Sequence, residues 1–119
     1  MSSIKFYYLY RDGANYKSWG EVVFTNPDRL TLEEIRTRLI TSFLPDRLFI
    51  AHQISITEKF LFLDGKFTNY DHCYHEFDNV EFCQEYPTDR LNRSITEFLK
   101  DVEAASKQGW KAFDILERA

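Results

Sequence analysis

The sequence predicts an α+β domain, a two-layer sandwich in which two amphipathic helices cover one face of an antiparallel or mixed sheet of about four to five strands. Three observations lead to this prediction. Segments typical of strands follow one another without crossover helices, two other segments carry apolar residues at helical spacing, and 119 residues is the length of one domain. With 44% hydrophobic residues and no internal repeat or linker, residues 1–119 are expected to form a single domain with one modest core.

Residues 4–11 are rich in aromatic side chains and are predicted to form the first strand. Alternate residues from Ile4 to Tyr10 share one face, and Tyr7 and Leu9 share the other. Because both faces carry apolar groups, we expect a central strand. A turn signal at residues 12–15 and a second apolar run at residues 19–25 complete a predicted hairpin.

Two helices are indicated by capping residues and by apolar stripes. The first is predicted to begin after Thr31, whose side chain can cap the first turn while Glu34 reaches back, and to end at Pro45. The second is predicted from about residue 90 to Gln108, with Gly109 as its stop. Its apolar stripe consists of Leu91, Ile95, Phe98, Leu99 and Val102.

The remaining segments give weaker patterns. Residues 47–56, 59–63 and 76–83 are predicted to be the third, fourth and fifth strands, although the register of the last is open. Residues 66–75 are ambiguous, and the last ten residues favour a short helix over a strand.

Composition excludes several classes of protein. Fifteen Lys and Arg residues against 19 Asp and Glu residues leave a net charge of −4, and the basic residues are scattered, so we do not expect nucleic acid as a partner. No apolar run is long enough to span a membrane, and the start is not a secretory signal, so we expect a cytoplasmic protein in which Cys73 and Cys83 are reduced. Four widely spaced glycines form no phosphate-binding loop, and no cofactor is expected.

The clearest charge feature is an acidic tract at residues 71–89, which holds six Asp and Glu residues and no Lys or Arg. One interpretation is a solvated strand face or loop. The other is a surface for a basic partner or a divalent cation, with Glu81 and Glu85 as candidate binding residues.

Within this tract, residues 71–78 combine two histidines, a cysteine and three acids. His72 and His75 are candidate metal ligands, and a small metal-dependent hydrolase is the alternative function that they suggest. Their spacing would place them on opposite faces of a strand, and neighbouring acids would raise the pKa of a cysteine nucleophile. Ordinary hydrogen bonding of the histidines is therefore preferred.

The hairpin loop offers a second candidate surface, because it combines aromatic, basic and amide groups. Tyr10, Arg11, Asn15 and Tyr16 lie in this loop, and Tyr70 repeats the pairing of an aromatic residue with an amide. Tyrosine and arginine often anchor protein interfaces. The alternative is a hydrogen-bonded turn whose tyrosines cover the core.

Residues 6–17, 20–24 and 75–77 resemble segments of a group of small uncharacterised bacterial proteins that share a YRDGxNYK-like hairpin. The resemblance implies a single-domain bacterial cytosolic protein, and it transfers no catalytic residue.

Together these observations favour a non-enzymatic module that binds another protein through the aromatic hairpin and the acidic tract. A homodimer that pairs sheet edges or helix faces about a two-fold axis is a further possibility, since this is the commonest assembly for small domains.

Overall fold

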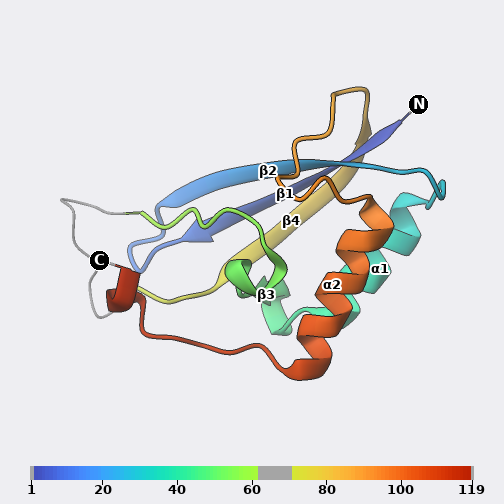
Figure 1. The fold of residues 1–119 in the computed structure, drawn as a ribbon. Coiled ribbons are helices and arrows are strands. Elements are labelled where there is room, and N and C mark those ends of the chain that lie inside the picture. Colours follow the sequence, from blue (N-terminus) through green and yellow to red (C-terminus); the bar gives the residue numbers. More distant parts are fainter. Residues whose placement is uncertain (1, 62–70, 119) are drawn as a thin grey trace.

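The first strand, β1 (Ser3–Arg11), lies at the centre of the sheet in the computed structural model (Figure 1). The structure describes residues 2–61 and 71–118, and within them four antiparallel strands follow the order β2-β1-β4-β3. Helices α1 and α2 pack on one face of this sheet, which confirms the predicted α+β class. The other elements are β2 (Lys17–Thr25), α1 (Leu32–Ser42), β3 (Leu48–Phe49), β4 (His75–Cys83) and α2 (Ile95–Gln108).

The hydrophobic core lies between the helices and the inner face of the sheet. As the alternation of β1 predicted, Ile4, Phe6, Tyr8 and Tyr10 all point to one side and are buried. Phe6 stacks on Phe77 of β4 and meets Phe98 of α2 edge to face. The central position predicted for β1 is also confirmed, because it pairs with β2 on one side and β4 on the other.

The predicted start of the second helix is wrong, because α2 begins at Ile95, where Ser94 and Glu97 form a capping box. Residues 90–94 instead form a turn in which the Asp89 carboxylate accepts hydrogen bonds from the backbone and guanidinium of Arg93. Asn92 adopts a left-handed conformation in this turn, which interrupts helical geometry. The first helix begins as predicted, since the Thr31 hydroxyl accepts from the Glu34 N–H at 3.1 Å.

The strand predicted at residues 47–56 is reduced to the two residues of β3, between short 3-10 helices at Pro45–Arg47 and Ala51–Ile54. Positive φ angles at Asp46 and Arg47 turn the chain away from an extended path. The strand predicted at residues 59–63 is absent from residues 59–61, and its other residues lie outside the described part. Here the backbone bonds to side chains: Tyr8 Oη donates to the Thr57 carbonyl, and the Lys59 N–H donates to His75.

The other two predictions of local structure agree with the fold. Residues 76–83 lie in β4, whose register against β1 shifts between Tyr7 and Tyr8 at a bulge. Near the C-terminus, Ile115–Arg118 forms a 3-10 helix, in keeping with the short helix predicted there.

Side chains and a loop cover parts of both sheet edges. Beside β2, the Thr88 N–H donates to the Val23 carbonyl at 2.9 Å, and the Thr88 hydroxyl accepts from the Val23 N–H at 2.9 Å. Beside β4, the guanidiniums of Arg47 and Arg36 donate to the carbonyls of Asp78 and Val80. Capped edges resist pairing with strands of other molecules.

Gly20 allows the ring of Tyr8 to lie against β2, and this close approach gives a first prediction. A Cβ at position 20 would lie 2.5 Å from Tyr8 Cζ, and the buried ring is held by its bond to Thr57. Gly20→Ala should therefore lower the free energy of unfolding by about 1–3 kcal/mol in urea titration. Ser18→Ala, two residues away on the same strand, is the control, with an expected change within about 0.5 kcal/mol. Equal effects of the two substitutions would show that the close contact does not matter.

Candidate functional site

The face of the sheet opposite the helices, called here the outer face, carries two of the predicted binding residues, Arg11 and Glu81, and adjoins a third, Glu85. Strand pairing places Tyr7 between Glu21 and Asn79, and Leu9 between Trp19 and Glu76. Trp19 is 55% exposed. The outer face consists of Lys5, Tyr7, Leu9 and Arg11 of β1, Lys17, Trp19, Glu21 and Val23 of β2, and Glu76, Asn79 and Glu81 of β4, with Glu85 adjoining.

One end of the outer face is acidic. The ammonium of Lys5 pairs with Glu85 and, at 3.8 Å, with Glu21, while the Tyr7 hydroxyl donates to Glu81. The Lys5 side chain is only 11% exposed, whereas those of Glu21 and Glu85 are more than half exposed. The hydrogen bond to Glu85 raises the pKa of Lys5 above its ordinary value despite its burial, and the bond to Glu81 raises the pKa of Tyr7. Both shifts reflect a negative local potential.

The other end of the outer face lies beside the hairpin. Arg11 forms an ion pair with Glu76 at 3.1 Å and donates to Asn15 Oδ1 at 2.6 Å. Glu76 raises the pKa of Arg11 and so favours its charged form. Lys17 is exposed at this end.

The hairpin loop itself is an ordered turn. The Asp12 carboxylate accepts hydrogen bonds from the N–H groups of Ala14 and Tyr16, both at 2.9 Å. Asn15 has a φ of 68°, as such turns require, and the ring of Tyr16 points outward and is largely exposed. The loop is therefore a hydrogen-bonded turn that also presents an aromatic side chain beside the outer face.

Two predicted binding residues are not on this surface. Tyr10 is fully buried, and its hydroxyl donates to the His72 carbonyl at 2.8 Å, so its ring is not open to a partner. Burial also raises the pKa of Tyr10 to about 12. Tyr70 lies outside the described residues.

A hollow of about 510 Å³ lies beside Trp19 and is lined by Tyr7, Trp19, Gly20, Glu21 and Lys59. It can receive a side chain that contacts aromatic surface and also meets one carboxylate and one ammonium. Trp19 and Lys59 were not among the residues predicted for a binding site. In a strand, Trp19 lies on the face opposite Val22 and Phe24, which are both buried. This alternation is the signal that could have identified Trp19 as an outward-facing residue.

His72 and His75 are not on opposite faces of one strand, because β4 begins at His75 and His72 precedes it. Both rings lie beside the ring of Tyr10, with centroids 5.2 and 5.4 Å from its centroid. The Nε2 atom of the fully buried His75 accepts from the Lys59 N–H at 2.8 Å, and His72 Nδ1 accepts from the Tyr74 N–H. Burial, assisted by His72, lowers the pKa of His75 to about 3. Across residues 2–61 and 71–118, no three His, Cys, Asp or Glu side chains are arranged to hold a metal ion.

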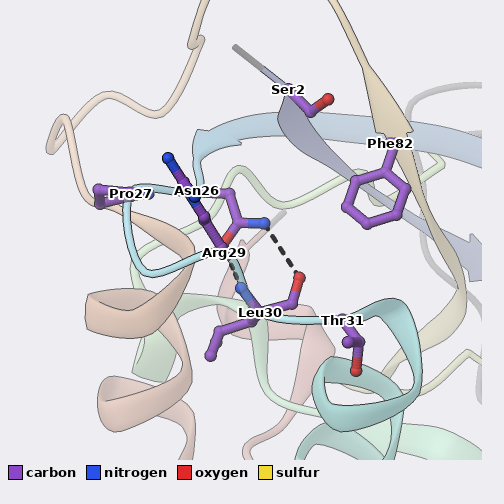
Figure 2. Close-up of a pocket in the computed structure, with 7 residues that line it drawn as sticks. All are labelled: Ser2, Asn26, Pro27, Arg29, Leu30, Thr31 and Phe82. Carbon is purple, nitrogen blue, oxygen red and sulfur yellow. Dashed lines mark hydrogen bonds between the residues drawn. The ribbon is translucent and has the colours of Figure 1, made fainter.

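A second cavity, of about 540 Å³, lies where the β2–α1 loop meets the ends of β1 and β4 (Figure 2). The Asn26 amide bridges both backbone groups of Leu30, at 3.1 and 3.0 Å, so this polar side chain is already used by the loop. Within the described part of the chain, the Arg29 guanidinium forms no hydrogen bond or ion pair. Half-exposed Phe82 supplies an apolar wall. No pattern in the sequence indicates this cavity.

Comparison of the chain with protein-family models, curated proteins and solved structures found no match. The resemblance to bacterial proteins with a similar hairpin stays a prediction. None of the helices in the described residues has both the length and the apolar character needed to cross a membrane.

Proposed function

We propose that this domain is a protein-interaction module and that the outer face is its contact surface. The observation that carries the proposal is Trp19, which is more than half exposed on the edge strand β2, next to Tyr7 and a hollow. Tryptophan, tyrosine and arginine are the side chains that most often anchor protein interfaces. Arg11, Glu81 and Glu85, three of the predicted binding residues, belong to the same surface or adjoin it.

The physical basis is that a partner gains most from burying a large aromatic side chain on backbone that is already ordered. Trp19 lies opposite buried Leu9 in a regular ladder, so a partner that covers it has only the side chain left to order. Charged groups around it supply orientation and raise the rate of association. The alternative, a metal-dependent hydrolase, finds no set of three ligands among the described residues, so we do not propose it.

Site-specific photo-cross-linking in the source cells tests this function. A chain with Trp19→p-benzoylphenylalanine should form a discrete cross-linked protein adduct, because position 19 would lie inside the interface. Ile40 is also an exposed apolar residue, but it lies on α1, so the same substitution there is the matched control. Adducts of equal yield at both positions, or none at position 19, would refute the outer face as the contact surface.

A further inference from the structure

We infer that residues 57–60, called here the strap, form a gate that swings away from the hollow beside Trp19 while the sheet and the helices stay folded. The strap lies beside two cavities and is held to the sheet by buried side chains, and these two observations carry the inference. The proposed function does not require this movement, which belongs to the chain itself whichever partner contacts the outer face.

Lys59 of the strap lines two cavities. One is the hollow of about 510 Å³ beside Trp19. The other is a cavity of about 150 Å³ lined by Thr57 and Lys59 of the strap, by Tyr8 and Glu21, and by the loop at residues 88–90. Glu21 and Lys59 line both cavities, so the two spaces adjoin at these side chains. Strap atoms that face a cavity have no packing partner on that side, which weakens their dispersion contacts.

The chain just before the strap is firmly fixed. The side chain of Ile56 is buried, and its N–H donates to the Ala51 carbonyl at 3.2 Å. The Ser55 carbonyl accepts from the guanidinium of Arg93, also at 3.2 Å. Ser55 has a left-handed φ of 56° where the 3-10 helix Ala51–Ile54 ends. Hinges commonly lie at such residues, so the strap has a fixed point about which to turn.

Two hydrogen bonds from the sheet hold the backbone of the strap closed. The Tyr8 hydroxyl donates to the Thr57 carbonyl at 2.7 Å, and the Lys59 N–H donates to His75 Nε2 at 2.8 Å. Both bonds join the strap backbone to a side chain, and neither belongs to the ladder between strands. The strap can therefore leave without disturbing a strand pair.

Side chains of the strap add further contacts. The ring of Phe60 meets the rings of Tyr10 and His75 edge to face, with centroids 4.9 Å apart in both cases. Glu58 lies 3.7 Å from Nδ1 of His52. Tyr10 and His75 are fully buried, whereas Phe60 is partly exposed. The closed strap thus separates these two buried side chains from solvent on its side.

Closing the strap also has an unfavourable effect at His75. Because Nε2 accepts from the Lys59 N–H, the proton of the neutral imidazole lies on Nδ1. Nδ1 is buried and has no hydrogen-bond partner among the described residues. A buried donor without an acceptor raises the free energy of the state that buries it, and exposure to water removes this effect. The closed strap is therefore held less tightly than its two backbone bonds alone indicate.

Opening changes both the shape and the charge of the hollow. When Lys59 moves out with the strap, the hollow keeps the carboxylate of Glu21 and loses its ammonium. The two cavities then join into one cleft that runs from Trp19 to Tyr8. The position of the strap therefore decides which of two surfaces the chain presents beside Trp19.

Native-state hydrogen exchange, measured by NMR at low urea concentrations, tests the gate. The Lys59 amide reports on the strap because it is bonded to His75, and the Phe6 amide reports on the central strand β1. After correction for intrinsic rates, we expect Lys59 to exchange at least about tenfold faster than Phe6, with little dependence on urea. Exchange of Phe6 should accelerate with urea, because it requires global unfolding.

A pair of matched variants tests the latch. Tyr8→Phe removes the bond to Thr57 but keeps the ring, so it should accelerate exchange of Lys59 about fivefold. Tyr10→Phe is the control, since it removes an equally buried hydroxyl whose bonds go to His72 and not to the strap. The control should change exchange of Lys59 by less than about twofold.

Two results would overturn the inference. One is exchange of Lys59 at the rate and with the urea dependence of Phe6, which would mean that the strap opens only when the whole chain unfolds. The other is an equal effect of the two phenylalanine substitutions on Lys59, or no effect of either. The first result is read from the original chain, so the test stands even if Tyr8→Phe does not fold. Neither result involves cross-linking at position 19, so failure of the gate leaves the proposed function intact.

Discussion

Replacing Arg93 with alanine should lower the free energy of unfolding by about 3–5 kcal/mol, because it would leave a buried carboxylate without its partner. Arg93 is 6% exposed and binds both oxygens of Asp89, each at 2.9 Å. Burial alone would raise the pKa of Asp89, yet the hydrogen bonds from Arg93 keep that pKa below its ordinary value.

The same guanidinium joins three parts of the chain that are distant in sequence. It donates to the carbonyls of Ile54 and Ser55 and to Asp101 of α2, at 2.9, 3.2 and 3.1 Å. Its plane also lies over the ring of Phe98, with the cation 5.1 Å from the centroid. No single substitute can replace all these contacts, so the loss should extend beyond the turn before α2.

Urea denaturation measures this effect, with Arg90→Ala as the control. Arg90 is exposed and only three residues away, so its replacement should change the free energy of unfolding by no more than about 0.5 kcal/mol. Arg93→Lys keeps the charge but loses the two-pronged geometry, and it should fall between the two. Similar stability of Arg93→Ala and Arg90→Ala would contradict a structural role for the buried pair.

His75 should make the protein less stable as the pH falls from about 6.5 towards 3. Its pKa in the folded state is about 3, against 6.5 for an ordinary histidine. Between these values the unfolded chain binds a proton that the folded chain does not, so stability is lost at up to about 1.4 kcal/mol per pH unit. Above pH 6.5 both states are neutral at this position and the contribution is constant.

The measurement is the free energy of unfolding at a series of pH values for the original chain and for His75→Gln. Glutamine can still accept from the Lys59 N–H but does not titrate, so the variant should have the shallower slope. His52→Gln, which removes a half-exposed histidine, should keep the steep slope. Parallel curves for the original chain and His75→Gln would show that this imidazole does not remain neutral.

Much of the architecture could be predicted because local patterns and tertiary packing agree. The alternation of β1 and the cap at Thr31 each identify their element correctly. The start of α2 could not be predicted from its apolar stripe, because the turn before it depends on Arg93 reaching the Ile54 carbonyl. The strand predicted after α1 was wrong for another reason. Asp46 and Arg47 adopt left-handed backbone conformations, and nothing in the composition of this segment indicates them.

The candidate site was predictable only in part. Charge patterning found Glu81 and Glu85, and the hairpin pattern found Arg11. Tyr10 was assigned to the surface although the alternation placed it with Ile4 and Phe6, which are buried. Trp19 was missed because a strand pattern separates two faces without saying which one the helices cover.

The position of β1 also bears on how the chain is made. One edge of β1 pairs with β2, the next strand to be synthesised, but the other edge pairs with β4, in a register that joins Ser3 to Cys83. A nascent chain therefore carries the aromatic face of its first hairpin through most of translation before β4 and α2 can enclose it. Such distant pairing slows folding, so we expect the native state to form in one late step, after most of the chain has left the ribosome.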